Sequence, residues 1–104
     1  MATPNLSLPQ KNIAQFCQRW AIVELALFGS ATRDDFTPDS DIDILVTFSP
    51  EAKWGLFDHV QMERELAKLL NRKVDLLTRR AVEKSHNWLL RREILDTAEI
   101  VYAA

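Results

Sequence analysis

Hydrophobic and polar positions follow two different periods along the chain. Alternation with a period of two is clearest from Asp41 to Phe48 and is typical of a strand that is buried on one side. A spacing of three to four residues is clearest from Leu56 to Leu70, with polar residues filling the other side, as in an amphipathic helix. The chain therefore combines strands and helices.

The same patterns divide the whole sequence into helices and strands. Helices are expected at Ser7–Trp20, Leu56–Leu70 and Val82–Leu95. Strands are expected at Ala21–Phe28, Asp41–Phe48, Lys73–Thr78 and Glu99–Ala103. We predict an α/β or α+β fold in which helices flank a small mixed β-sheet.

Length and composition limit the architecture to one domain. The chain has 104 residues, so we expect a single domain over residues 1–104. Its 47% hydrophobic and 27% charged residues argue against a disordered chain. The single cysteine, Cys17, excludes an internal disulfide and fits a reducing compartment. With neither a leader nor an apolar run of membrane length, the sequence predicts a cytoplasmic protein without a membrane association.

Charge is nearly balanced overall but unevenly distributed. Thirteen Lys and Arg residues against fifteen Asp and Glu residues give a net charge of -2, which does not favour direct nucleic-acid binding. Five aspartates lie between Asp34 and Asp43, whereas basic residues gather in the last third of the chain. Those basic residues are either a solvated helix face or a surface that steers ATP or an acidic partner.

Two aspartates open the alternating strand. Asp41 and Asp43 are two residues apart, so their side chains project to the same face of an extended strand. Neighbouring carboxylates repel one another when both are ionised, and a divalent cation is the usual means of holding them together. Hard oxygen ligands favour magnesium or manganese.

A third aspartate interrupts another apolar strand. Asp75 lies within Lys73–Thr78, where an unpaired carboxylate is costly to bury. If this strand lies beside the one opened by Asp41, three carboxylates converge, and such a set can hold two ions roughly 3.5–4 Å apart. Otherwise Asp75 is a surface carboxylate paired with Lys73 or Arg72.

A glycine and a serine follow the first apolar strand. Gly29 lets the backbone approach a phosphate closely, and the hydroxyl of Ser30 can donate a hydrogen bond to it. Ten residues separate Ser30 from Asp41. A phosphatase motif that also contains Asp-x-Asp is disfavoured, because here the apolar residues follow the aspartates.

The run FGSATRDDFTPDSDIDILVTF resembles the signature of the polymerase-β-like nucleotidyltransferases, and more narrowly of the minimal nucleotidyltransferases. That family has a Gly-Ser pair, a spacer, an Asp-x-Asp that opens a strand, and a third aspartate on a later strand. The matching positions are Gly29, Ser30, Asp41, Asp43 and Asp75. The helix that ends ELAKLLNRKVDLLT and the closing EIVYA strand extend the resemblance over most of the chain.

The resemblance implies a catalytic site and its ligands. Asp41 and Asp43 would be catalytic ligands of magnesium, with two ions expected, and Asp75 would be the third ligand or the base that accepts a proton. The nucleotide, ATP, would be bound by Gly29, Ser30, Arg33 and Ser40. Arg33 is as readily a partner of Asp34 or Asp35.

The resemblance also implies a partner. Minimal nucleotidyltransferases are commonly encoded with a HEPN-domain toxin and act as antitoxins, in some cases by transferring AMP from ATP to a tyrosine hydroxyl of the toxin. A homodimer and a hetero-oligomer with the toxin are the assemblies considered.

Two other functions remain open. After the serine the family often has Arg-Ala-Arg-Gly, whereas this chain has Ala31-Thr32-Arg33-Asp34, so neutralisation of a toxin by binding alone is the alternative. Nucleotide transfer to a small molecule usually needs a further domain.

Some conspicuous side chains are not assigned to the site. His59 and His86 are expected on helix surfaces, and Cys17 is expected in the core. Trp54 is a candidate contact surface.

Overall fold

The computed structural model describes residues 9–29 and 41–104. The helices are α1 (Gln10–Arg19), α2 (Leu56–Leu70), α3 (Arg79–Glu83) and α4 (Trp88–Thr97). The strands are β1 (Ile22–Phe28), β2 (Ile42–Phe48), β3 (Val74–Thr78) and β4 (Glu99–Ala103). None of the helices within these two ranges is long and apolar enough to cross a membrane.

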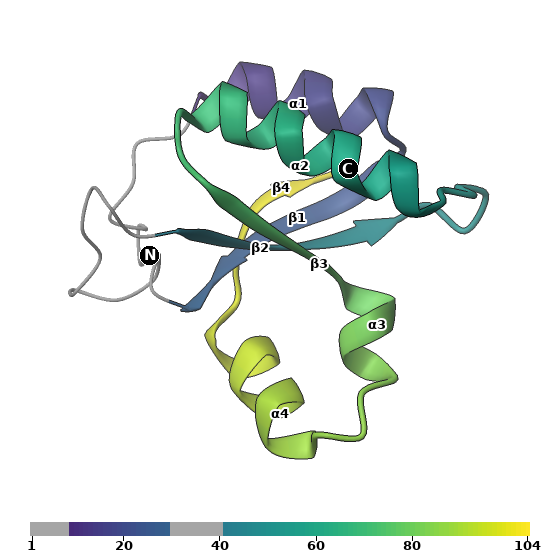
Figure 1. The fold of residues 1–104 in the computed structure, drawn as a ribbon, viewed down its shortest axis with the longest axis vertical. Coiled ribbons are helices and arrows are strands. Elements are labelled where there is room, and N and C mark those ends of the chain that lie inside the picture. The colour runs from purple at the N-terminus through teal and green to yellow at the C-terminus, as the bar shows by residue number, and fades with distance from the viewer. Residues whose placement is uncertain (1–8, 30–40) are drawn as a thin grey trace.

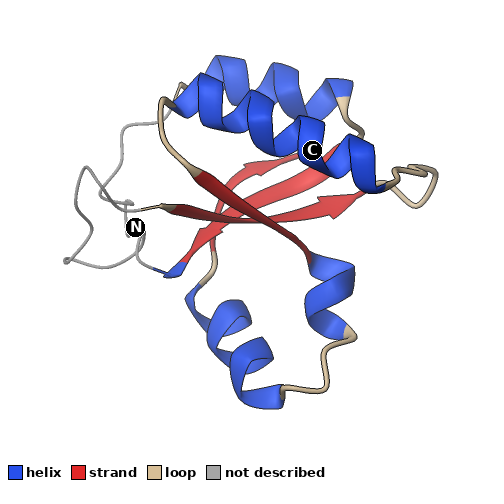
Figure 2. Cartoon of the chain, viewed as in Figure 1, coloured by secondary structure: helices blue, strands red, loops and turns tan. Residues whose placement is uncertain are grey.

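The four strands form one mixed sheet in the order β3-β2-β1-β4. Strand β1 is antiparallel to β2 and to β4, whereas β2 and β3 are parallel. Helices α1 and α2 cover one face of the sheet, and α3 and α4 lie on the other (Figures 1 and 2). The predicted small mixed sheet flanked by helices is confirmed.

Each face of the sheet has its own apolar cluster. The larger cluster joins α1 and α2 to the sheet and includes Phe16, Leu27, Ile44, Met62 and Leu66. The smaller cluster lies under α3 and α4 and consists of Ala26, Phe28, Leu45, Val82 and Ile94. More apolar surface is therefore buried between the sheet and α1/α2 than between the sheet and α3/α4, so the α1/α2 layer contributes more to the stability of the fold.

A bulge in β1 sets which of its side chains face each layer. The pairing register with β2 shifts between Ile22 and Glu24, so Ile22 and Leu25 both join the α1/α2 core despite their odd spacing. Glu24 then accepts from Arg79 Nη1 of α3 at 3.3 Å, and Arg79 Nε also donates to Glu83 at 3.2 Å. The bulge thereby connects α3 to the sheet.

Polar contacts of Trp20 join α1 to α2 and to the loop before it. Trp20 Nε1 donates to Glu65 Oε2 at 3.0 Å, and Arg19 pairs with the same carboxylate. Trp54 packs edge-on against Trp20 with ring centroids 5.1 Å apart, and its Nε1 donates to the Trp20 carbonyl oxygen at 2.8 Å. Trp54 is thus an anchor of this loop, although 39% of it is exposed.

The predicted helix Val82–Leu95 is wrong as one element, because the structure has two. Helix α3 ends at Glu83, and α4 begins at Trp88. Asn87 is the last residue of the loop between α3 and α4. Its side chain accepts a hydrogen bond from the Leu90 amide at 3.1 Å and so caps the N-terminus of α4. The apolar spacing continues across the break, which hides it from a periodicity argument.

The other element ends lie within three residues of the sequence predictions. Helix α2 ends as predicted at Asn71, which adopts the left-handed conformation with φ of 55°. Helix α1 begins at Gln10, three residues after the predicted start, and residues 7 and 8 lie outside the described ranges. Ala21, predicted as the first strand residue, instead makes a turn with φ of 56° before β1.

We expect Leu66→Ala to lower the free energy of unfolding by about 2–5 kcal/mol, because Leu66 is fully buried between α2 and the sheet. The matched control is Leu56→Ala on the same helix, where the side chain is 77% exposed and the expected change is below about 0.5 kcal/mol. Urea unfolding monitored by circular dichroism measures both. Equal midpoints for the two variants would contradict the assigned core.

We expect Cys17 to resist alkylation in the folded chain. Burial raises the pKa of its thiol from 9.0 to about 12, so the reactive thiolate is scarce near neutral pH. Iodoacetamide at pH 8 should react at least about 100-fold more slowly than in urea-unfolded protein. Because the folded-state pKa is the higher one, the thiol stabilises the fold below pH 9, and this contribution is lost as the pH rises towards 12.

Candidate active site

The N-terminal ends of β2 and β3 bring two predicted carboxylates into register. Because these strands are parallel, both begin at the same edge of the sheet, and Asp43 lies directly opposite Asp75. Neighbouring strands are about 4.8 Å apart, so residues paired in this way are near neighbours. The sequence argument required these strands to be adjacent, and they are.

Alternation decides the face on which the two carboxylates lie. The paired neighbours Ile42 and Val74, and then Ile44 and Leu76, are buried against α1 and α2. The residues between them therefore project to the α3/α4 face. Asp43 is half-buried there and Asp75 is exposed.

The other predicted ligands lie at or beyond the start of β2. Asp41 is exposed and immediately precedes the strand. Ser30, Arg33 and Ser40 lie outside the described residues, so their assignment to nucleotide binding stays a prediction.

Gly29 lies against the carboxylate of Asp43. It follows β1 with φ of 66°, a conformation that residues with a Cβ rarely adopt. A Cβ at this position would clash with Asp43 Oδ2. The backbone at the end of β1 and the carboxylate on β2 are thus close neighbours, and only glycine fits between them.

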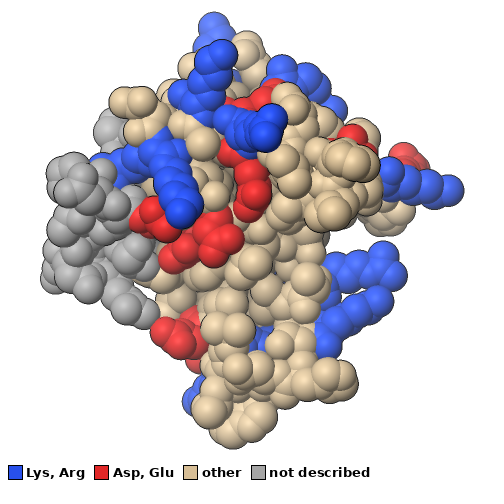
Figure 3. All heavy atoms as spheres, viewed as in Figure 1, with Lys and Arg blue, Asp and Glu red and all other residues tan. Residues whose placement is uncertain are grey.

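The donor set has the chemistry expected of a magnesium site. Asp43 and Asp75 offer only carboxylate oxygens, which hard divalent cations prefer, and acidic side chains gather at the edge where β2 and β3 begin (Figure 3). Within residues 9–29 and 41–104, however, no three His, Cys, Asp or Glu side chains come together closely enough to hold an ion. Magnesium binding therefore stays a prediction.

A pocket of about 310 Å³ adjoins this edge of the sheet. Its sheet side is formed by Phe28, Gly29 and Asp43, and its other side by residues of α4. The α4 residues are Leu90, Glu93, Ile94 and Thr97. Glu93 and Thr97 were not predicted from the sequence. Their spacing of four places them on one side of a helix, but only the packing of α4 shows that this side faces Asp43.

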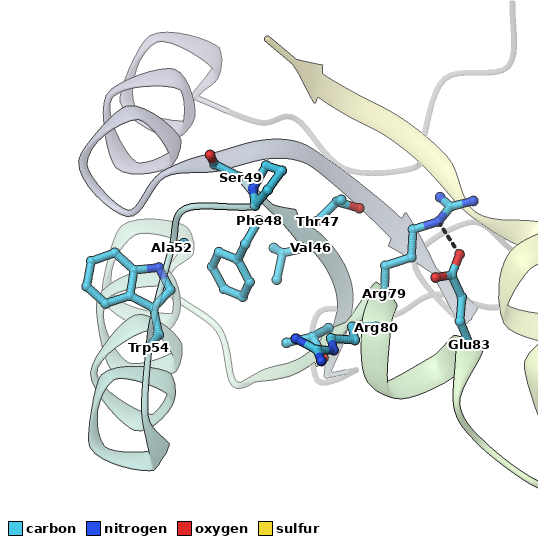
Figure 4. Close-up of a pocket in the computed structure, with 11 residues that line it drawn as sticks. Val46, Thr47, Phe48, Ser49, Ala52, Trp54, Arg79, Arg80 and Glu83 are labelled. Carbon is cyan, nitrogen blue, oxygen red and sulfur yellow. Dashed lines mark hydrogen bonds and ion pairs between the residues drawn. The ribbon is translucent and has the colours of Figure 1, made fainter.

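A second pocket, of about 400 Å³, lies at the other end of β2. Figure 4 shows Phe48 and Trp54 on one side and Arg79, Arg80 and Glu83 of α3 on the other. Its lining includes none of the three predicted aspartates. The pocket is therefore separate from the candidate active site. Arg79 in its wall pairs with Glu24 and Glu83.

Residues 10–101 match the family model described as a nucleotidyltransferase domain. The chain belongs to this family, and it is a nucleotidyltransferase.

A relative from Thermococcus cleftensis, the protein adenylyltransferase MntA, is 32% identical over 78 residues. The match covers 75% of this chain and 77% of the relative. The relative is thus similar over most of both lengths.

Solved structures share the fold at lower identity. A toxin-antitoxin crystal structure with AMP-PNP contains a chain that matches with a TM-score of 0.72 and 21% identity, over 93% of this chain and 75% of that one. A structure of a tri-AMPylated HEPN toxin of Shewanella oneidensis with an MNT antitoxin matches with a TM-score of 0.62 and 20% identity, over 91% and 70%. These similarities support the minimal nucleotidyltransferase fold.

We expect Gly29→Ala to reduce nucleotide transfer sharply and to lower the free energy of unfolding by at least about 1–2 kcal/mol, because Cβ meets both an unfavourable φ and Asp43. Gly55→Ala is the matched control. Gly55 has φ of -98°, and the nearest atom to an added Cβ is Asp58 Oδ2 at 3.9 Å, so we expect a stability change within about 0.5 kcal/mol. Thermal melts and a pyrophosphate-release assay with ATP measure both properties. An unimpaired Gly29→Ala variant would contradict the close approach.

Proposed function

We propose that this chain is a magnesium-dependent protein adenylyltransferase that transfers AMP from ATP to a hydroxyl group of a protein. The observation that carries the proposal is the register of Asp43 with Asp75 beside the backbone of Gly29. It combines an oxygen-rich cation site with a backbone position that a phosphate can approach.

Each residue has a distinct part in the proposed reaction. Asp41 and Asp43 would hold magnesium, which when bound supplies charge neutralisation of the triphosphate and orientation of the leaving group. Gly29 and Ser30 would hold the β- and γ-phosphates, and Ser40 and Arg33 would add contacts to the nucleotide. Asp75 is the third ligand or the general base, and its exposed position beside Asp43 suits either part.

The bond changes follow from this placement. The acceptor hydroxyl oxygen attacks the α-phosphorus of ATP, its proton passes to a carboxylate, and the bond to pyrophosphate breaks. Phosphates held near Gly29 would keep the leaving pyrophosphate in line with the attacking oxygen, as the displacement requires. The products are an adenylylated protein and pyrophosphate.

The proposed acceptor is a tyrosine of a HEPN-domain toxin, and the chain would then act as its antitoxin. A relative named protein adenylyltransferase and a structural neighbour that contains an AMPylated HEPN toxin support this proposal. The reaction needs ATP, and the single cysteine, Cys17, has no partner for an internal disulfide, which agrees with a place in the cytoplasm.

Neutralisation by binding alone is the second candidate. It is favoured by the sequence Ala31-Thr32-Arg33-Asp34, which lacks an arginine and a glycine that the family often has after the serine. An antitoxin of this kind would need one molecule for each toxin, whereas an enzyme modifies many.

We expect Asp43→Asn to reduce adenylyl transfer more than about 100-fold, because it removes a charged ligand from the pair that faces Asp75. The free energy of unfolding should change by less than about 1 kcal/mol, since one of two neighbouring like charges is lost. The measurement is intact mass spectrometry of a purified HEPN-domain partner after incubation with ATP and magnesium.

Asp96→Asn is the control for this experiment, because it removes an exposed carboxylate of α4 that pairs with Arg92 at 3.5 Å. Its transfer rate should equal that of the unaltered chain. Neutralisation of toxin by Asp43→Asn at a one-to-one ratio, as complete as that by the unaltered chain and with no adenylyl mass on the partner, would establish binding alone and overturn the enzymatic proposal.

A further inference from the structure

We propose that Glu93 and Thr97 bind the ribose hydroxyls of the nucleotide and make the site discriminate against a nucleotide that lacks one of them, such as 3′-deoxy-ATP. The inference rests on the proposed use of ATP. It extends that proposal by naming two residues that would recognise the ribose of the substrate. It comes from the pocket between α4 and the edge of the sheet that carries Asp43.

The walls of this pocket suit a small ring. Phe28 from β1 and Leu90 and Ile94 from α4 give it apolar sides. Its volume of about 310 Å³ is at the small end of the range for ligand pockets, which fits part of a nucleotide.

Among the described residues of the lining, the polar side chains act as hydrogen-bond acceptors. Asp43 and Glu93 are carboxylates. The hydroxyl of Thr97 donates its proton to the backbone carbonyl oxygen of Glu93 at 2.8 Å, so its oxygen is left to accept. On the α4 side of the pocket, the Glu93 carboxylate and the Thr97 oxygen favour a neutral group that brings donors of its own over an anionic group.

A ribose diol matches the position and number of these acceptors. Glu93 and Thr97 are one helical turn apart, so both are presented on the side of α4 that lines the pocket. The 2′- and 3′-hydroxyls lie on adjacent carbons and each offers one proton. Acidic side chains bind the ribose hydroxyls in other nucleotide sites by the same chemistry.

The pocket also lies where the sugar would be expected. It shares Gly29 and Asp43 with the proposed phosphate and magnesium site. The sugar is the group joined directly to the α-phosphate, so a nucleotide whose phosphates lie at Gly29 carries its ribose to a neighbouring position. Among the described residues that line the pocket no side chain offers a free donor, which favours a neutral hydroxyl ligand over a carboxylate or a phosphate at that wall.

The test compares the affinities of ATP and 3′-deoxy-ATP for the full chain in the presence of magnesium, each measured by displacement of a fluorescent ATP analogue. Both nucleotides carry the same triphosphate and base and differ only at the 3′-hydroxyl, so the ratio of their affinities reports the contact of that hydroxyl. We expect the unaltered chain to prefer ATP by about tenfold, which is the loss expected when a hydroxyl bonded to a charged acceptor is removed.

Glu93→Ala should reduce this preference to less than about threefold, mainly by weakening ATP binding relative to 3′-deoxy-ATP. Alanine favours helix, so α4 should keep its structure, and circular dichroism checks this. The matched control is Asp96→Ala, which removes another exposed carboxylate of α4 that does not line the pocket. It should leave the preference unchanged.

Four results would overturn the inference, and they differ in what they imply for the proposed function. Equal affinity for both nucleotides in the unaltered chain, or an unchanged ratio in Glu93→Ala, refutes the ribose contact while nucleotide use stands. If Glu93→Ala leaves the affinity ratio unchanged but slows transfer to a protein acceptor, the pocket binds the acceptor side chain instead of the ribose. Failure to bind either nucleotide refutes the proposed function as well.

Discussion

The candidate active site depends on the in-register parallel pairing of β2 with β3. Side chains alternate between the two faces of a sheet, so burial of Ile42, Ile44 and Leu76 under α1 and α2 forces Asp43 and Asp75 to the opposite face. A slip of β3 by one residue would place Asp75 in the core and an apolar side chain opposite Asp43. The hydrophobic core thus sets the positions of the charges.

Two further contacts support the part of the sheet that carries Asp43 and Asp75, and neither involves a proposed ligand of the metal ion as donor. Glu63 of α2 accepts from the amide of Leu76 at 3.0 Å, which satisfies a backbone group on the open edge of β3. Gly29 allows the end of β1 to approach Asp43 without a clash. A substitution of Glu63 would therefore alter the support of β3, which carries Asp75, and a substitution of Gly29 would displace the carboxylate of Asp43.

Much of this arrangement could be predicted from the sequence because it depends on local patterns. The alternation from Asp41 to Phe48 gave β2 and its paired aspartates, and the amphipathic period gave α2 with its end at Asn71. The adjacency of β3 was only a condition in the sequence argument, since strand pairing depends on residues about thirty positions apart. The family resemblance, confirmed by the matched domain, supplied what local patterns could not.

The errors and omissions have physical causes. The break between α3 and α4 was missed because apolar residues keep a helical spacing across it, although Asn87 is a typical capping residue. Glu93 was missed because its position near Asp43 depends on how α4 packs against the sheet, and no local pattern contains that information. The parts of Ser30, Arg33 and Ser40 remain predictions.

Helix α4 is held to the sheet by little apolar burial. Ile94 is its only buried residue, and Trp88, Leu89 and Leu90 are largely exposed, whereas α1 buries three residues. An element of this kind is expected to open locally at a smaller free-energy cost than the core helices. A ligand held between α4 and Asp43 would then slow amide hydrogen exchange along α4, which links occupancy of the site to the local stability of one helix.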